Sequence, residues 1–370
     1  MATKSLDVKL ARIKADPNCR EFIIADAKDG DMALGIAAPG KSLVDIMLMS
    51  AHTNDILTIR ERLFDDSHVT PAARANDTTD IHMVREGAFR AEPSRPFRTT
   101  TIDQIQCGRV ECDPKERVLG ANLGLYSVTF NNDVDLDRRT LEQYRTFRIE
   151  AEQKGFRHFL EVFDPNAPQA PISPDGLGGF INDVIVRCLA GVPESGRPLF
   201  LKMVYHGPKY TEELARYDPT LVIGILGGSA GTTYDAFKLI AEGQKHGARV
   251  ALFGRKINNA ENQLAFIEML RRIVDGQISP EEAVRAYHGI LQGLGIKPYR
   301  SLDEDMRLTD QSMSYASPTQ AVVPGRRLTR AGDGGRAVSK PVAAEARPAP
   351  GTRPAAPAPG FDKMTPDERL

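Results

Sequence analysis

A lysine stands in the middle of a short apolar run, residues 199–205, which Gly207 and Pro208 close. Runs bounded by turn residues in this way are typical of a strand buried on both faces in a parallel sheet. An ammonium buried there must be paired or deprotonated, and a neutral buried lysine is a nucleophile toward carbonyls. Lys202 is therefore a candidate imine-forming residue. The alternative is a lysine near a strand end whose amine reaches solvent or a carboxylate.

Three more polar residues interrupt apolar strands. Glu161 lies within the run 159–163, and Asp26 and Lys28, two positions apart, share one face of the first strand. Glu161 could move protons during carbinolamine dehydration, while Lys28 would be the second cation that favours a neutral Lys202 amine. Asp26 could hold Lys28 or a substrate hydroxyl, or cap the following turn. A network of structural ion pairs is the alternative to a catalytic site.

Two glycine-containing turns suit a phosphate group. Gly228 and Ser229 precede a predicted helix, where backbone N–H groups and the helix dipole favour an anion. Gly254 and Arg255 follow the next predicted strand and add amides and a guanidinium. Turns after the last two strands are the recurrent phosphate site of one architecture, the (β/α)₈ barrel.

The alternation of predicted strands and helices along the chain indicates the same architecture. Eight βα units predict a (β/α)₈ TIM barrel over residues 1–316, with an irregular insertion at 85–120 after strand three. An open doubly wound sheet would instead place its glycine-rich loop after the first strand. Residues 317–370 are rich in Pro, Ala, Gly and Arg, which predicts a disordered tail. The predicted strands are 22–28, 44–49, 78–83, 125–130, 158–163, 199–205, 221–226 and 249–253.

Composition narrows the functional classes. The net charge of −1 predicts no nucleic-acid or membrane partner, and no apolar run approaches the roughly 18 residues that span a bilayer. The N-terminus shows no signal-peptide pattern, so we expect a cytoplasmic protein. The four cysteines, Cys19, Cys107, Cys112 and Cys188, are too sparse for a disulfide framework or a zinc site, and are interpreted as structural or incidental.

Two remaining residues carry weaker predictions. Tyr126, on the fourth strand, is expected to belong to the core rather than to a catalytic site. His206 follows the lysine strand and either contacts the substrate or is merely an exposed loop residue.

Together these motifs resemble a known family. Phe159-Leu160-Glu161, then Leu201-Lys202, then residues 228–231 and Gly254-Arg255 resemble the class I aldolases of the tagatose-1,6-bisphosphate and archaeal-type fructose-bisphosphate aldolase family. The resemblance covers residues 20 to 275 and is clearest from 156 to 257. It implies a barrel and Schiff-base chemistry without metal or cofactor. By the resemblance, Lys202 forms the imine, Glu161 is the acid/base, and Gly228, Ser229, Gly254 and Arg255 hold the phosphate.

The chain departs from the family pattern in three places. Lys28 stands where the family carries the arginine of an Asp-Gln-Arg segment, and the insertion at 85–120 and the proline-rich tail have no counterpart. These departures bear on the substrate more than on the lysine chemistry.

The sequence thus predicts an aldolase that cleaves or forms a phosphorylated ketose, with dihydroxyacetone phosphate as one product. We expect the protein to form a homo-oligomer and to bind a small phosphorylated sugar as its substrate. The alternatives are a non-catalytic phosphosugar-binding barrel and a phosphosugar isomerase or lyase of another class.

Overall fold

The computed structural model describes residues 3–28, 43–81, 84–89, 91–227 and 231–310 of the 370-residue chain. The predicted tail at 317–370 therefore lies outside the described residues, as do Gly228 and Ser229. Within the described part, no helix is both long and apolar enough to cross a membrane.

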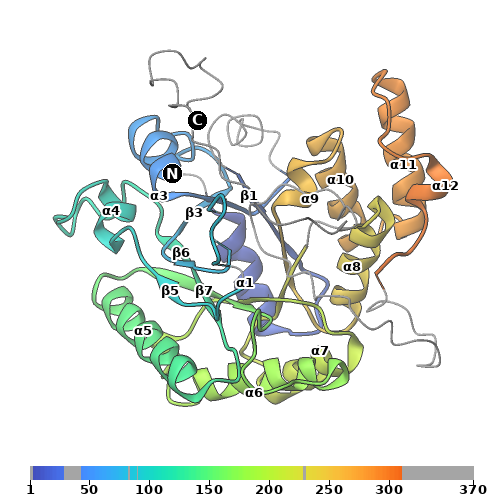
Figure 1. Cartoon of the computed structure of the whole chain (residues 1–370). Coiled ribbons are helices and arrows are strands. Elements are labelled where there is room, and N and C mark those ends of the chain that lie inside the picture. The colour runs from blue at the N-terminus through green and yellow to red at the C-terminus, as the bar shows by residue number, and fades with distance from the viewer. Residues whose placement is uncertain (1–2, 29–42, 82–83, 90, 228–230, 311–370) are drawn as a thin grey trace, which may run out of the picture. The chain divides into compact units, whose positions relative to one another are not determined.

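Eight parallel strands close into a barrel, as the sequence predicts. Their order around the barrel is β1-β10-β9-β8-β7-β6-β3-β2, so that the first and last barrel strands of the chain are hydrogen-bonded neighbours. Parallel strands need crossover connections, and here these are mostly helices, which surround the strands in Figure 1. The barrel strands are β1 (Ile23–Ala27), β2 (Ile46–Met49), β3 (Thr70–Arg74), β6 (Leu123–Thr129), β7 (Arg157–Phe163), β8 (Leu201–Met203), β9 (Gly224–Leu226) and β10 (Val250–Phe253).

The sequence predicts helices at 6–15, 54–64, 101–106, 137–154, 178–189, 210–217 and 260–275, one that ends at 246 and one that starts after Ser279, and the observed helices lie close to these positions. Most begin at a side-chain cap; Ser279, for example, accepts a hydrogen bond from Glu282 N and precedes Pro280, the first residue of its helix. Sequence reasoning missed two short helices: α12 near the C-terminus, and α9, because the helix after Gly254 was predicted to begin only at residue 260. The principal helices are α1 (Ser5–Ala15), α3 (Ala51–Asn54), α4 (Ile102–Cys107), α5 (Val134–Gln153), α6 (Leu177–Leu189), α7 (Pro208–Tyr217), α8 (Thr233–Lys245), α9 (Arg255–Asn258), α10 (Gln263–Val274), α11 (Pro280–Gly293) and α12 (Leu302–Asp305).

Alternation along each strand divides the core into two layers. One cluster of buried side chains lies between the strands and the surrounding helices. The second fills the barrel interior and includes Ala25, Phe159 and Phe200, together with Leu6 and Leu10 of α1. Helix α1 therefore packs its apolar face against the interior cluster. A side chain's place in a strand decides which layer it enters.

The third strand is the one barrel strand that the sequence placed wrongly. It was predicted at 78–83, whereas β3 is Thr70–Arg74 and pairs in parallel with both β2 and β6. Its sequence, Thr-Pro-Ala-Ala-Arg, lacks the branched and aromatic side chains that mark strands, and proline is rare inside a sheet. Small residues are nevertheless suited to this position because Ala72 and Ala73 are each fully buried.

The chain between β3 and β6 holds the predicted insertion. It contains helix α4, expected at 101–106, and a short antiparallel pair that was not predicted, β4 (Asp77–Thr78) with β5 (Pro96–Phe97). Thr101 and Gln104 form a reciprocal capping box that starts α4, and Gly108 ends it with a left-handed φ of 78°.

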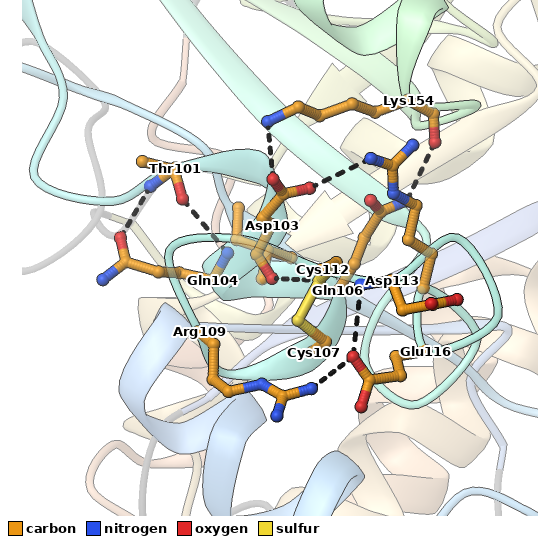
Figure 2. Close-up of a disulfide and its surroundings, with 12 residues drawn as sticks. Thr101, Asp103, Gln104, Gln106, Cys107, Arg109, Cys112, Asp113, Glu116 and Lys154 are labelled. Carbon is orange, nitrogen blue, oxygen red and sulfur yellow. Dashed lines mark hydrogen bonds and ion pairs between the residues drawn. A yellow bond between two sulfur atoms is a disulfide. The ribbon is translucent and has the colours of Figure 1, made fainter.

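A disulfide joins Cys107 to Cys112 in this insertion (Figure 2), a pairing that was not predicted from the sequence, so these two of the four cysteines are structural and not incidental. Their Cα atoms lie 6.1 Å apart because the turn at Gly108 reverses the chain directly after Cys107. Beside it, Asp103 accepts a 2.9 Å hydrogen bond from Lys154 of the loop after α5. The remaining two cysteines, Cys19 and Cys188, are free.

Candidate active site

Lys202 and Glu161 face each other inside the barrel. They occupy paired positions of β8 and β7, and Lys202 Nζ lies 2.6 Å from Glu161 Oε1. Both side chains are almost wholly buried, with 3% and 1% of their surfaces exposed. The structure therefore brings together the predicted nucleophile and the predicted proton carrier, and it gives the buried ammonium the counter-charge that its burial requires.

A serine on the next strand adds a third polar side chain to this pair, and we call Lys202, Glu161 and Ser127 the polar row. Ser127 of β6 is paired with Glu161, and its hydroxyl donates a 2.7 Å hydrogen bond to Glu161 Oε2. Asn76, just past β3, fixes the serine backbone: its Oδ1 accepts from Ser127 N at 2.6 Å and its Nδ2 donates to Ser127 O at 2.8 Å. The two oxygens of Glu161 are thus held from opposite sides, one by an amine and one by a hydroxyl.

An apolar layer lies two residues before this polar row. Phe159 and Phe200 precede Glu161 and Lys202 on the same faces of their strands, and their rings stack with centroids 4.6 Å apart. Because the active face of a TIM barrel is the C-terminal end of its strands, the polar row lies toward that end and the phenylalanines lie beneath it. The stacked rings therefore cover the lysine–carboxylate pair on the side of the N-terminal ends of the strands.

This arrangement can carry out imine chemistry. An ammonium and a carboxylate at 2.6 Å can exchange a proton directly, which makes the amine a nucleophile and the carboxyl group a proton donor. The amine can then add to a ketone, and the protonated Glu161 can return its proton to the departing carbinolamine hydroxyl. Ser127 keeps the carboxyl group in position through both transfers.

Asp26 and Lys28 form a second buried pair elsewhere in the barrel. Lys28 Nζ lies 3.1 Å from Asp26 Oδ2 and donates a 2.5 Å hydrogen bond to Asn258 Oδ1 of α9. Burial lowers the pKa of Lys28, and the negative charge of Asp26 opposes this shift. Asp26 pairs in register with Phe253, a member of the outer layer.

The two ion pairs therefore belong to different faces of the barrel wall. Ala25 and Ala27 of β1 contribute to the interior, so the alternate Asp26 points to the outer layer, toward α9. Strands β10 and β9 separate β1 from β8. The structure confirms that Asp26 and Lys28 meet each other, but it does not bring them to Lys202 and Glu161.

Half of the predicted phosphate site can be described. Gly254 precedes α9 and Arg255 is its first residue, directly after β10 as expected, whereas Gly228 and Ser229 lie outside the described residues. The neighbouring Lys256 donates a 2.9 Å hydrogen bond to Gly231 O, which links the two turns. Burial, and then the positive charge of Arg300, lower the pKa of Lys256 to about 8.

The first turn of α8 is occupied by the protein's own side chains. Thr233 N donates to Asp305 Oδ1 at 2.7 Å, and Asp235 N donates to the Thr232 hydroxyl at 3.1 Å. These amides already have acceptors, so a phosphate here would have to bind through other groups than the Thr233 and Asp235 amides.

Sequence reasoning missed three polar residues in this part of the barrel. Ser127 and Asn76 were not singled out, and Arg74 lies on the inward face of β3, beside the interior Ala72, with an ion pair to Asp77 at 3.5 Å. For Ser127 a signal was present, because it lies four and two residues after the interior residues Leu123 and Leu125 and so shares their face of the strand. Arg74 could not be found while its strand was misplaced.

The two residues with weaker predictions are also placed. Tyr126 points to the outer layer and stacks on Phe147 with centroids 4.4 Å apart, which confirms it as a core residue. His206 is not merely exposed: its Nε2 lies 2.9 Å from Asp164 Oδ1, and 11% of its side-chain surface is exposed.

Comparison with known proteins identifies the same fold in solved structures. They include an archaeal fructose 1,6-bisphosphate aldolase (15% identity, TM-score 0.53, covering 74% of this chain and 100% of that one). Another structure, of an archaeal fructose-1,6-bisphosphate aldolase with its catalytic lysine bound covalently to the carbinolamine intermediate of the substrate, gives 15% identity and a TM-score of 0.52, covering 73% of this chain and 99% of that one.

A fructose-bisphosphate aldolase from Slackia heliotrinireducens DSM 20476 gives 13% identity and a TM-score of 0.51, covering 76% of this chain and 89% of that one. Neither a family model nor a curated protein matches the sequence. At these identities the likeness shows a shared fold, that of the family which the sequence motifs resemble.

Proposed function

We propose that this protein is a class I aldolase that cleaves or forms a phosphorylated ketose through an imine on Lys202. The 2.6 Å contact between Lys202 and Glu161, buried at paired strand positions, is the observation that carries the proposal. The solved structures named above support it, because they are aldolases of the same fold and one holds a carbinolamine on its catalytic lysine.

In the proposed reaction Lys202 adds to the ketone, and Glu161 supplies the proton that lets the carbinolamine hydroxyl leave as water. The iminium ion then accepts the electrons of the breaking carbon–carbon bond as an enamine. Protonation of the enamine and hydrolysis of the imine release dihydroxyacetone phosphate. Gly254 and Arg255, with Gly228 and Ser229 of the neighbouring turn, would hold its phosphate at the rim.

Asp26 and Lys28 take a different part in this proposal from the one that the sequence predicted. Their contacts to each other and to Asn258 brace the end of β1 against α9. We therefore assign the imine chemistry to Lys202 and Glu161 alone. A cytoplasmic location and a homo-oligomeric state remain predictions from the sequence.

Borohydride trapping tests the proposal directly. We expect incubation with dihydroxyacetone phosphate and sodium borohydride to add the mass of the reduced adduct to the peptide that contains Lys202. The Lys202→Met variant should give no adduct, and Lys28, a second buried lysine, is the internal control for non-specific labelling. An unmodified Lys202 peptide in the wild-type protein would contradict the proposal and leave a non-catalytic sugar-phosphate-binding barrel.

A further inference from the structure

A histidine–carboxylate pair lies at the rim of the same two strands that carry Glu161 and Lys202. Asp164 directly follows β7, and His206 comes three residues after β8 ends. His206 Nε2 lies 2.9 Å from Asp164 Oδ1. Because parallel strands end at one edge, this pair lies nearer that rim than the buried lysine–carboxylate pair does.

The surroundings of His206 fix its ring. A carboxylate beside Nε2 accepts the proton of that nitrogen, which leaves Nδ1 as the acceptor in the neutral ring. Among the described residues, His206 Nδ1 has no hydrogen-bond partner. The start of helix α6 packs against the same residue: a Cβ built on Gly178 would lie 2.3 Å from the Tyr210 ring and 2.8 Å from His206 Cβ. The glycine therefore lets α6 pack closely against both Tyr210 and His206.

Cleavage of a ketose through an imine needs proton transfer at two separate places. One lies at the carbinolamine, next to the lysine nitrogen. The other is the hydroxyl on the far carbon of the bond that breaks: a base takes its proton, that carbon becomes an aldehyde, and the bonding electrons move to the iminium nitrogen as an enamine. Glu161, at 2.6 Å from Lys202 Nζ, is placed for the first transfer.

We propose that His206, oriented by Asp164, is the base that takes the hydroxyl proton in the cleavage step and returns it in aldol formation. This assignment rests on the proposed aldolase function. The two proton transfers are then carried out by two different groups. Glu161 of β7 lies buried beside the lysine, and His206, which follows β8, lies at the rim. Asp164 acts as a positioning residue that holds the ring with Nδ1 as its basic atom.

A purely structural histidine–carboxylate contact offers a matched control. His246, which caps the C-terminal end of α8, lies 2.7 Å from Glu212 Oε1 and 3.4 Å from Glu242 Oε2, and its side chain is 12% exposed against 11% for His206. The helices run opposite to the strands, so the C-terminal end of α8 lies at the end of the barrel away from the rim. Replacing His246 removes a comparable contact without touching the proposed site.

The test separates imine formation from bond cleavage in His206→Gln, Asp164→Asn and His246→Gln. Borohydride trapping with dihydroxyacetone phosphate reports the imine. A coupled triose-phosphate assay on fructose 1,6-bisphosphate, tagatose 1,6-bisphosphate and fructose 1-phosphate reports cleavage. We expect His206→Gln to keep the wild-type adduct yield and to lose cleavage by about 10²- to 10⁴-fold, the usual contribution of a general base. His246→Gln should keep both.

Asp164→Asn keeps the histidine, so it still tests the assignment if His206→Gln fails to fold. We expect an intact adduct and slower cleavage, because the neutral amide stabilises the protonated ring less well than the carboxylate does. Cleavage by His206→Gln or Asp164→Asn at the rate of His246→Gln would overturn the assignment, as would a parallel loss of adduct and cleavage. A wild-type protein without an adduct at Lys202 would instead overturn the proposed function, and this assignment with it.

Discussion

The amine of Lys202 and the carboxylate of Glu161 meet at 2.6 Å on directly paired positions of two neighbouring strands. Register alone brings them together, since the two side chains are inward on adjacent strands at the same height. Ser127 extends the row to a third strand. The result is a buried pair whose two members each need the other, for stability as much as for chemistry.

A double-mutant cycle should reveal this dependence. Removing either partner of a buried ion pair typically costs about 3–5 kcal/mol, because the other charge remains in a dry site. We expect Glu161→Gln and Lys202→Met each to lower the free energy of unfolding by this order. The combined variant should lose less than their sum, by roughly 0.5–3 kcal/mol. Chemical denaturation measures all three, and additive losses would show that the two side chains do not interact.

Most of the fold could be predicted from hydrophobic runs and turn residues, because seven of the barrel strands carry branched or aromatic side chains. β3 could not, because Thr70-Pro71-Ala72 has neither a strand composition nor a hydrogen-bond donor at the proline. The disulfide was missed for a related reason: a separation of five residues brings Cys107 and Cys112 together only once Gly108 turns the chain back.

The candidate site was predictable only in part. A strand alternates its side chains, so Lys202 and Glu161 could both be placed inside once Phe200 and Phe159 were recognised as interior residues. The same rule paired Asp26 with Lys28, but it could not say which face of β1 they occupied. Two alanines, Ala25 and Ala27, take the interior positions there, and alanine fits either layer. Contacts made by loops, such as Asn76 to Ser127, follow from tertiary packing alone.

The pair of Lys28 and Asp26 should matter for stability and not for imine formation. We expect Lys28→Met to lower the free energy of unfolding by about 3–5 kcal/mol, since the buried Asp26 carboxylate loses this ammonium. At low denaturant and temperature the folded fraction should still trap dihydroxyacetone phosphate on Lys202. Intact-mass analysis after borohydride reduction, normalised to the folded fraction, is the measurement. Loss of the adduct from folded protein would show that Lys28 contributes to imine formation after all.

Lys256 should give the protein a pH-dependent stability in the alkaline range. Burial lowers its pKa in the folded state to about 8 from the ordinary 10.5. Between these values the unfolded chain binds more protons than the folded one, so the contribution of Lys256 to stability rises with pH and is least favourable below about 8. We expect the free energy of unfolding of the wild type, relative to Lys256→Met, to increase from pH 8 to pH 10. A difference that stays flat or falls would contradict the lowered pKa.

The Cys107–Cys112 disulfide should add modest stability and leave the lysine chemistry unchanged. A loop this short constrains the unfolded chain by about 2 kcal/mol. Reductant, or the paired Cys107→Ser and Cys112→Ser changes, should lower the free energy of unfolding by that order. Alkylation under denaturing conditions before and after reduction should label two and then four cysteines, since Cys19 and Cys188 are free throughout. Four labels without reductant would show that the pair is a dithiol in the protein as isolated, as a reducing compartment favours.

Ser127 should act through Glu161 and not by contact with the substrate. Its hydroxyl donates to Glu161 Oε2 at 2.7 Å, and a hydrogen bond to a charged group is typically worth about 1.5–3 kcal/mol. Ser127→Ala should lower the free energy of unfolding by this order. It should also slow formation of the Lys202 adduct by about tenfold, because a freely rotating carboxyl group returns its proton less often in the right geometry. Ser127→Thr retains the hydroxyl and a side chain that suits a strand, and should recover most of both losses. Stopped-flow mixing with dihydroxyacetone phosphate followed by borohydride quenching gives the adduct rate; an unchanged rate in Ser127→Ala would show that Glu161 is held without the serine.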